Sequence, residues 1–342
     1  MNIKNISQWI LIIVTLFSVN IFSQDFTKAG TSAAQFLKIP VGARAVSMAG
    51  TFASVNDDIS SLYWNPAGIA AMENVSFGFS HSDWIADFKH NFLGFVLPLE
   101  DRSSVGFSVI SLTSGDIEAT TIEKPHGTGT FYNASDLAIS ISYARYLIEQ
   151  VSVGLSAKYI HQSIWNTSAN TFAFDIGVIL HTGFYGMKMG LSFQNFGPEM
   201  QLDGSDLIKV IDQDPDSETN PLTEAKLNTH PNNLPTSYRL SVSLPLIGEN
   251  SPFTLNNSSL LISTDAIHSN DNKEHYSIGA EYGFMNTIFV RGGYHFNTDE
   301  QGLTLGSGIK INFGQTDVTF DYAYSSFGVF GSINFLSVGI KL

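Results

Sequence analysis

The segment GLTLGSGIKINF, residues 302–313, has the pattern that decides the fold. Apolar side chains fall on one parity (Leu303, Leu305, Ile309, Ile311, Phe313), and polar or small ones on the other (Thr304, Gly306, Gly308, Lys310, Asn312). Successive side chains of a strand point to opposite faces, so this segment predicts a strand with one apolar and one polar face. The apolar face either forms the core of a soluble sandwich or turns outward to lipid in a barrel. A strand that crosses a bilayer needs about 9–11 residues, a length that this segment has.

The composition favours the barrel. Charged residues make up 14% of the 342 residues, against about 25% in an average soluble domain. Aromatic residues (12%) and 29 glycines suit many strands rather than a helical enzyme. The net charge of −14 argues against a nucleic-acid partner, which needs clustered Lys and Arg. Cysteine is absent, which excludes disulfides, thiolate chemistry, Cys-based metal sites and a lipoprotein anchor.

Residues 1–23 are predicted to be a signal peptide. Lys4 supplies the positive start, residues 9–19 an apolar stretch, and Ser23 a small residue at its end. The apolar stretch is shorter than the roughly 20 residues of a spanning helix, and no later segment has that character. We therefore expect export, with any membrane embedding through a barrel.

Residues 24–72 differ from the remainder of the chain. Residues 31–37 and 57–64 are predicted to form short helical segments, the first with a Thr or Ser cap. Proline and glycine interrupt the region, and it is rich in Ala and Gly. Two interpretations stay open: a cap at the N-terminus, or a plug (hatch) inside a barrel.

Residues 73–342 are predicted to form an antiparallel transmembrane barrel. Fourteen candidate strands follow one another: 74–82, 87–98, 103–112, 130–146, 151–163, 169–182, 186–196, 235–247, 258–268, 275–284, 286–297, 302–313, 316–326 and 331–342. An even number is typical of bacterial barrels. Most links from an even to an odd strand are tight, whereas 113–129 and 197–234 are long. This asymmetry predicts periplasmic short turns and an extracellular loop at 197–234. The predicted fold class is all-β: a 14-stranded barrel with a small helical plug in its lumen.

Three stretches carry a resemblance to a known family: GTSAAQFL at 30–37, GARAVSMAG at 42–50 and YWNPAG at 63–68. They resemble the N-terminal signature of the PorV/PorQ family, FadL-like outer-membrane barrels of Bacteroidetes-type Gram-negative bacteria. The signature residues are Gly42, Arg44, Met48, Gly50, Trp64, Asn65, Pro66, Ala67 and Gly68. The resemblance implies a hatch-bearing barrel of the type IX secretion system, with translocon proteins and the C-terminal signal domains of secreted cargo as partners. It leaves open the PorV-like, PorQ-like or an unassigned branch.

Charged side chains on the polar parity are predicted to face the lumen: Lys158, Asp175, Arg239, Arg291 and Lys310. Arg44, Arg239 and Arg291 are expected to pair with Asp57, Asp58 or Asp175 and hold the plug to the wall. The alternative is a polar relay or a ligand contact. Five aromatic residues are predicted to form an interfacial girdle: Trp84, Trp165, Tyr143, Tyr322 and Tyr324.

No motif predicts catalysis, a metal site or a cofactor. The nine histidines are scattered without His-Glu-x-x-His, and no Gly-x-Ser-x-Gly joins a strand to a helix. Asp212, Asp214, Asp216 and Glu218 alternate as calcium ligands can, but Pro215 interrupts them and the glycine of a calcium loop is missing. A solvated acidic loop is the favoured interpretation.

Two functions follow as hypotheses. The first is an outer-membrane component of type IX secretion that binds cargo or the translocon, in contact with outer-membrane lipid. The alternative is a FadL-like transporter of hydrophobic small molecules through a hatch and a lateral opening. A purely structural barrel is the third possibility.

Overall fold

The computed structural model describes residues 30–212, 222–248 and 251–342. The predicted signal peptide, residues 24–29 of the predicted plug, and Asp214, Asp216 and Glu218 lie outside this part of the chain.

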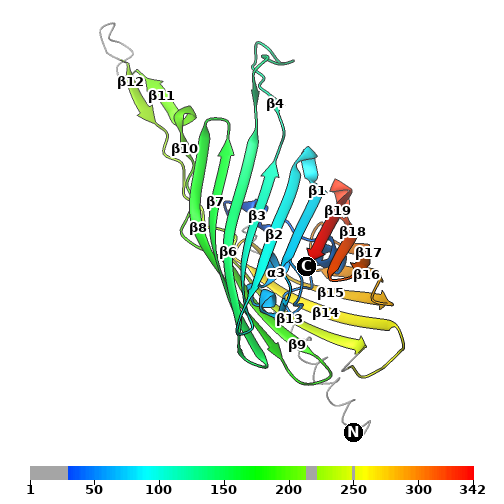
Figure 1. Ribbon diagram of the computed structural model, residues 1–342. Helices are drawn as coiled ribbons and strands as arrows, with labels where there is room; N and C mark the ends of the chain where they lie inside the picture. The colour runs from blue at the N-terminus through cyan, green and yellow to red at the C-terminus, as the bar shows by residue number, and fades with distance from the viewer. Residues whose placement is uncertain (1–29, 213–221, 249–250) are drawn as a thin grey trace.

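Fourteen antiparallel strands close into a barrel (Figure 1), which confirms the predicted fold class. In chain order they are β1 (Ser76–Asp83), β2 (Lys89–Leu99), β3 (Ser103–Thr113), β6 (Ala134–Ile148), β7 (Val151–Ile164), β8 (Thr167–His181), β9 (Lys188–Phe196), β13 (Ser237–Ile247), β14 (Ser258–Ser269), β15 (Asn272–Phe284), β16 (Ile288–Phe296), β17 (Leu303–Phe313), β18 (Thr316–Ser326) and β19 (Ser332–Lys341). Neighbours in the chain pair with one another, and β1 pairs with β19 to close the ring.

The two longest connections emerge from the same end of the barrel, as the parity of the loop lengths predicts. The β3–β6 connection carries a short ribbon of β4 (Ile117–Glu118) and β5 (Phe131–Tyr132). The β9–β13 connection carries β10 (Asp203–Gly204), which pairs with β8, the 3₁₀ turn η4 (Ser205–Leu207), and a ribbon of β11 (Ile208–Ile211) and β12 (Thr223–Lys226). In Figure 1 both connections rise beyond the barrel wall.

The outer face of the barrel is apolar, and the inner face is polar or small. In β17, Leu303, Leu305 and Ile309 are 48%, 48% and 51% exposed, whereas Thr304 between them is fully buried. The same alternation holds in β8, where exposed Phe174 and Ile176 flank buried Asp175. A continuous apolar exterior of this kind is stable against hydrocarbon rather than water. The sandwich interpretation is therefore wrong for this chain.

No helix among the described residues is long and apolar enough to cross a membrane.

The N-terminal segment fills the lumen, so the plug interpretation holds rather than the cap. We call residues 30–75 the hatch. Its short helices are η1 (Gln35–Lys38), α2 (Ala43–Ser47), α3 (Ser61–Trp64) and η2 (Pro66–Ala71), and Figure 1 shows them in blue inside the barrel. The helix expected over residues 31–37 is replaced by η1, and no side chain caps it. Ala34, at the cap position, is left-handed (φ 48°), and its N–H donates to the wall residue Gln162 at 2.9 Å. The wall thus fixes the backbone at the start of η1, without the expected Thr or Ser cap.

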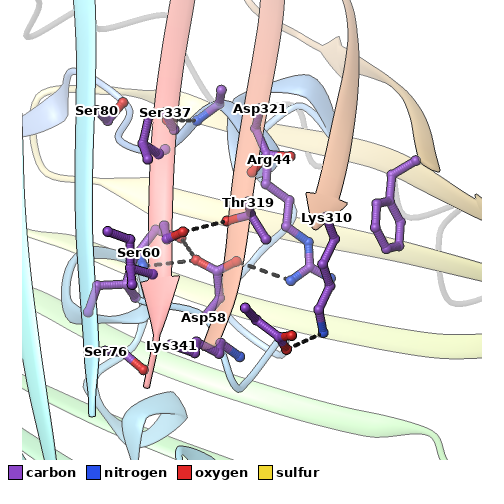
Figure 2. A pocket seen from close by; sticks show the side chains of 18 of the residues that line it. Arg44, Asp58, Ser60, Ser76, Ser80, Lys310, Thr319, Asp321, Ser337 and Lys341 are labelled. Atoms are coloured by element: carbon purple, nitrogen blue, oxygen red, sulfur yellow. Dashed lines mark hydrogen bonds and ion pairs between the residues drawn. The ribbon is translucent and has the colours of Figure 1, made fainter. Parts of the chain in front are cut away.

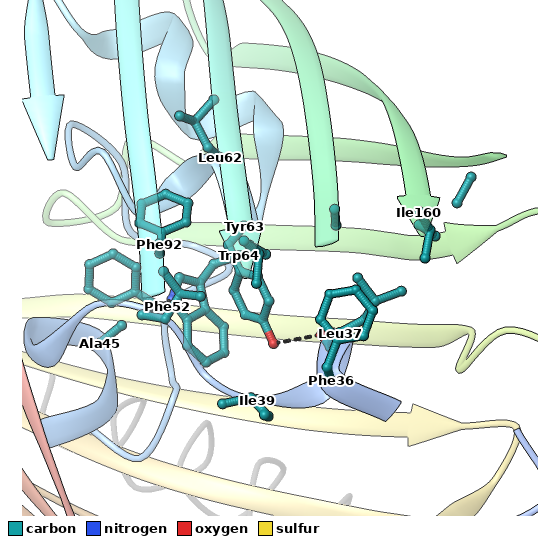
Figure 3. Packing of buried hydrophobic residues seen from close by; sticks show 14 of the residues in the cluster. Phe36, Leu37, Ile39, Ala45, Phe52, Leu62, Tyr63, Trp64, Phe92 and Ile160 are labelled. Atoms are coloured by element: carbon teal, nitrogen blue, oxygen red, sulfur yellow. Dashed lines mark hydrogen bonds between the residues drawn. The ribbon is translucent and has the colours of Figure 1, made fainter. Parts of the chain in front are cut away.

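An apolar cluster joins the hatch to one side of the wall (Figure 3). Phe52, Leu62 and Trp64 of the hatch belong to this cluster together with Phe92 of β2 and Ile160 of β7. Each of these five side chains is almost fully removed from solvent, so the contact contributes burial energy of roughly 1.5–3 kcal/mol per large side chain.

Elsewhere the hatch backbone lies directly on glycines of the wall. A Cβ atom on Gly177 of β8 would overlap the side-chain oxygen of Asn65, and one on Gly190 of β9 would overlap the carbonyl of Ala53. A Cβ on Gly293 of β16 would lie 2.5 Å from the carbonyl carbon of Met48. These glycines leave the space that the hatch occupies.

The neighbouring pair Gly292 and Gly293 provides a matched test of this packing. We expect Gly293→Ala to destabilise the protein by about 1–3 kcal/mol, because the new methyl group overpacks the hatch–wall contact. Gly292→Ala is expected to be near neutral, since its Cβ would meet nothing closer than 3.6 Å. Urea unfolding of the detergent-solubilised barrel measures the difference. Equal losses in the two variants would contradict the proposed contact.

Candidate functional site

The hatch lies between two cavities. The cavity nearer the long loops has a volume of about 580 Å³ and is lined partly by Trp84 of the β1–β2 loop and Phe327 of the β18–β19 loop. The cavity nearer the short turns measures about 320 Å³ and is lined partly by Asn286 of the β15–β16 turn. Helix α2 contributes to both, with Arg44 in the short-turn cavity and Val46 in the loop-side cavity. The hatch therefore forms the partition.

The loop-side cavity combines aromatic side chains with polar and charged ones. Its aromatic lining includes Phe36, Tyr63, Trp64, Trp84, Phe327 and Phe330. Its polar lining includes Gln194, Asn195, Arg239, His275 and His295. The expected girdle role of Trp84 is wrong, because its ring packs on Phe327 at 5.2 Å and lines this cavity instead of the outer face. The other predicted girdle residues, Trp165, Tyr143, Tyr322 and Tyr324, are exposed.

The short-turn cavity has apolar walls as well, but it carries the denser set of charged side chains (Figure 2). Arg44, Asp58, Lys310, Asp321 and Lys341 are among the charged residues that line it. An apolar molecule gains little from such surroundings, since it would displace water from charged groups without replacing their hydrogen bonds.

The aromatic floor of the loop-side cavity is held by backbone contacts within the hatch. The Trp64 indole N–H donates to the Val41 carbonyl at 2.9 Å, and the Tyr63 hydroxyl donates to the Leu37 carbonyl at 3.1 Å. Burial raises the pKa of Tyr63 to about 12, so its hydroxyl stays neutral and keeps its proton at physiological pH. The two rings meet edge to face, with their centroids 4.9 Å apart.

The family-signature residues mostly build this floor. Asn65 caps η2 by accepting from the Ala67 N–H at 3.1 Å, and its amide donates to the Ala53 carbonyl at 2.6 Å. Pro66 occupies the first turn of η2, where its missing N–H has no cost. Gly50 (φ +65°) lies against the Trp64 ring, and a Cβ atom added to Gly50 would lie 2.9 Å from a carbon of that ring.

The remaining signature glycines and Met48 also serve the packing of the hatch. A Cβ on Gly42 would lie 3.0 Å from Ser60, and one on Gly68 would lie 2.6 Å from the Ser61 hydroxyl. Met48 is completely buried beneath Gly293.

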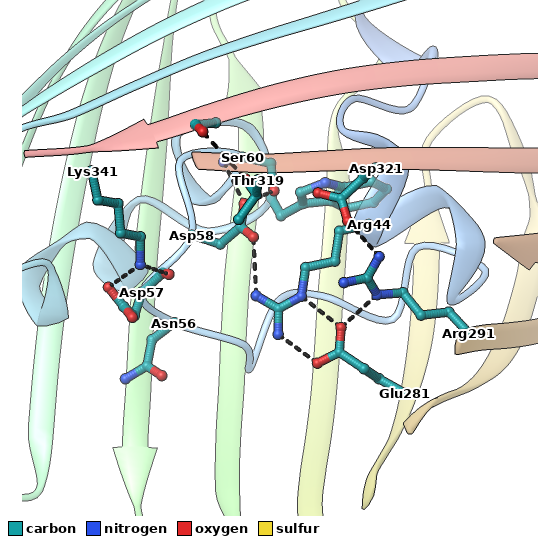
Figure 4. Close-up of polar contacts among 12 residues, drawn as sticks. Arg44, Asn56, Asp57, Asp58, Ser60, Glu281, Arg291, Thr319, Asp321 and Lys341 are labelled. Atoms are coloured by element: carbon teal, nitrogen blue, oxygen red, sulfur yellow. Dashed lines mark hydrogen bonds and ion pairs between the residues drawn. The ribbon is translucent and has the colours of Figure 1, made fainter. Parts of the chain in front are cut away.

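Arg44 joins two hatch segments to the wall (Figure 4). Its guanidinium donates to both oxygens of Glu281 on β15, at 2.7 and 2.8 Å, and to Asp58 at 3.1 Å. Burial alone would lower the pKa of Arg44, but Glu281 and Asp58 raise it well above its ordinary value. Burial would likewise raise the pKa of Asp58, but Arg44 and hydrogen bonds from Ser60 outweigh it, so the pKa of Asp58 is lowered.

The other predicted ion pairs are partly different from those expected. Arg291 donates to Glu281 at 2.5 Å and to Asp321 at 2.6 Å, so it braces the wall and does not contact Asp57, Asp58 or Asp175. Asp57 pairs with Lys341 at 2.8 Å. Sequence reasoning missed Glu281 and Asp321, although both lie on the lumen parity of their strands.

Two further ion pairs involve residues predicted to face the lumen. Lys158 pairs with Asp175 at 2.6 Å, where a bulge between β8 and β9 also brings the Asn195 N–H to Asp175 at 2.8 Å. Lys310 pairs with Asp317 at 2.7 Å. Asp175 is therefore a partner of a wall lysine, and not of the hatch arginine.

Arg239 projects from β13 towards the hatch and stacks over the Trp64 ring, with its Cζ 4.7 Å from the ring centroid. Its nearest carboxylate is Asp265, 3.9 Å from Nη1. Within the described residues, no group of three or more His, Asp or Glu side chains is arranged to hold a metal ion.

A second anchor ties η1 to the β14–β15 turn. The Asp271 carboxylate accepts from Gln35 at 2.7 Å, from Lys38 at 3.1 Å and from the Ser269 hydroxyl at 2.6 Å. Burial would raise the pKa of Asp271, but these donors outweigh it, so its pKa is lowered.

Several solved structures have a similar fold. Among solved structures, the chain is similar to the CymD monoaromatic hydrocarbon channel (14% identity, TM-score 0.56, covering 89% of this chain and 97% of that one). It is also similar to the Ralstonia pickettii toluene transporter TbuX (12% identity, TM-score 0.56, covering 88% of this chain and 97% of that one). A third similar structure is a Pseudomonas aeruginosa FadL homologue (12% identity, TM-score 0.50, covering 88% of this chain and 98% of that one). The chain has a FadL-type fold. This barrel resembles those of Gram-negative outer-membrane proteins.

A family model described as Uncharacterised protein family (UPF0164) matches residues 15–171 of this chain. No curated protein sequence matches it.

The two carboxylate anchors predict a loss of hatch stability in acid. A lowered folded-state pKa means that Asp58 and Asp271 contribute stability above their ordinary pKa of about 4, and that this contribution disappears as the pH falls through the lower folded-state value. We expect the protection factors of the amide hydrogens in η1 and α2, meaning exchange relative to the intrinsic rate at each pH, to fall between about pH 5 and pH 3.

Asp271→Asn is expected to cost about 1–2 kcal/mol at pH 7 and to weaken the acid response of η1. Asp299→Asn, in the exposed β16–β17 loop, serves as the control and is expected to behave like the wild type. An acid response that is unchanged in Asp271→Asn would show that this anchor does not hold η1.

Proposed function

We propose that the protein is an outer-membrane channel that takes up hydrophobic small molecules, with the loop-side cavity as the binding chamber and the hatch as the gate. The carrying observation is the aromatic cavity above the hatch, inside a closed barrel with an apolar exterior. Its volume of about 580 Å³ lies within the range of small-molecule sites, roughly 300–1,000 Å³.

The likeness to other barrels supports this proposal. Two of the similar structures are a monoaromatic hydrocarbon channel and a toluene transporter, so the same fold serves hydrophobic solutes in those proteins. Fold alone does not determine function, and the argument for this chain depends on its own cavity.

The two cavities suggest a route that avoids the charged chamber. A groove of about 360 Å³ lies on the outer face near the β8–β9 bulge, lined by apolar residues such as Val178, Leu191 and Leu240. This groove shares Arg239 and Ile267 with the loop-side cavity. We propose that an apolar molecule leaves sideways here, towards hydrocarbon, because that path never exposes it to the charges around Arg44.

Narrowing the loop-side cavity tests the proposal. Asn272 is exposed and lines the cavity, so Asn272→Trp is expected to reduce toluene uptake into proteoliposomes several-fold by occupying part of the chamber. Asn256→Trp, an equally exposed change near the short turns, is the matched control and is expected to leave uptake unchanged. Wild-type liposomes that accumulate toluene no faster than empty ones would refute the channel.

One observation favours a second candidate, the binding of type IX translocon proteins or cargo signal domains. The β11–β12 ribbon exposes Ile208, Val210 and Ile211, and its outer backbone edges have no partner strand within the described residues. Two-stranded ribbons are marginally stable alone, and an open edge suits a strand from another protein.

The pair of changes Val210→Lys and Ile211→Lys tests this second candidate. If the ribbon binds a protein, the double variant is expected to lose co-purifying translocon or cargo proteins from detergent extracts while toluene uptake stays normal. Asn272→Trp should show the opposite behaviour. Retention of the same co-purifying proteins by the double variant would exclude the ribbon as their docking site.

A further inference from the structure

Arg239 is a lumen arginine whose hydrogen-bonding capacity the chain does not use. It donates no hydrogen bond to any part of the chain that the structure describes, and its Nε and Nη1 atoms are shielded from solvent without a partner. Asp265, at 3.9 Å, is beyond hydrogen-bond length. The other two lumen arginines differ, since Arg44 and Arg291 each donate to two carboxylates.

Unsatisfied donors of this kind are rare and often mark a functional site. A buried charged donor is costly to leave without an acceptor. Asp265 compensates the charge of Arg239 through space, but it leaves the directional donors unused.

The guanidinium is also held in place for a ligand. It stacks on the Trp64 ring at 4.7 Å, which fixes its plane. The side chain is 12% exposed and lines the loop-side cavity beside Tyr63. An aromatic molecule in this cavity thus meets ring faces and a cationic donor at the same place.

We infer that the loop-side cavity selects aromatic compounds that carry an oxygen acceptor over plain aromatic hydrocarbons, with the oxygen accepting from Arg239 and the ring lying among the more exposed aromatic lining residues, such as Trp84 and Phe330. The inference rests on the proposed function, which makes this cavity the binding chamber. Because Asp265 already balances the charge of Arg239, a neutral hydroxyl or carbonyl oxygen suits the site as well as a carboxylate does. This ligand class differs from the hydrocarbons of the similar channel and toluene transporter.

The test measures binding of three probes to the full chain in detergent micelles by isothermal titration calorimetry. Benzyl alcohol carries a neutral oxygen, benzoate carries a charged one, and toluene carries none. We expect benzyl alcohol, benzoate or both to bind roughly tenfold more tightly than toluene. Preference for both identifies any oxygen acceptor, and preference for benzoate alone identifies a carboxylate.

A double variant removes the donor without leaving a buried carboxylate unpaired. Arg239→Met with Asp265→Asn is expected to abolish the difference in affinity between the oxygenated probes and toluene. Asp265→Asn alone keeps the guanidinium and should keep the preference, with tighter benzoate binding. Arg102→Met is the matched control, because Arg102 also stacks on a ring (Tyr146, at 4.0 Å) but lies in the β2–β3 turn.

The outcomes separate the inference from the proposed function. Equal affinity for all three probes in the wild type overturns the inference and leaves the channel proposal standing. So does an oxygen preference that survives in the double variant. Failure of every probe to bind overturns both.

Discussion

The close approach of the hatch backbone to glycines of the barrel wall is the constraint on which the rest of the structure depends. At Gly177, Gly190 and Gly293 there is no room for even one additional carbon atom. Small hydroxyl side chains continue the contact, with Thr51 bonded to Ser263 at 2.6 Å and Ser54 to Ser241 at 2.8 Å. Close contact on this scale positions the hatch because packed interiors resist overlap far more steeply than they reward attraction.

The hatch is held differently on its two sides. Towards β2 and β7 the contact is apolar, with Leu62 and Trp64 in one cluster with Phe92 and Ile160. Towards β15 it depends on charge, through Arg44 and Glu281. Apolar contacts respond little to protons, whereas ion pairs respond to pH and to competing charges. A change in pH or a competing charge is therefore expected to weaken the contact between hatch and wall on the charged side, and not on the apolar side.

This division also separates the chemistry of the two cavities. The aromatic rings that cap the apolar cluster face the long loops, and the charged anchors face the short turns. The second cavity carries more charged side chains, so an apolar solute is less favoured there than in the first. The unused donors of Arg239 lie at the boundary, where the aromatic chamber, the wall and the outer groove meet.

The sequence by itself determined the strands, their number and the faces they present, because side-chain alternation is a local property with period two. The same alternation predicts inward-facing positions for Lys158, Asp175, Arg239, Arg291 and Lys310, and composition sets the N-terminal segment apart from the strands. Only the tertiary structure decided the partners: Glu281 for Arg44, Lys158 for Asp175 and the Trp64 ring for Arg239. Parity states that a side chain points inward, but the opposing residue depends on the closure of the ring and the path of the hatch. The contacts of Arg44 with Glu281 and of Arg239 with Trp64 join residues far apart in the chain, and no local pattern encodes them, whereas Lys158 and Asp175 lie on the neighbouring strands β7 and β8 and their contact depends on the register of that hairpin.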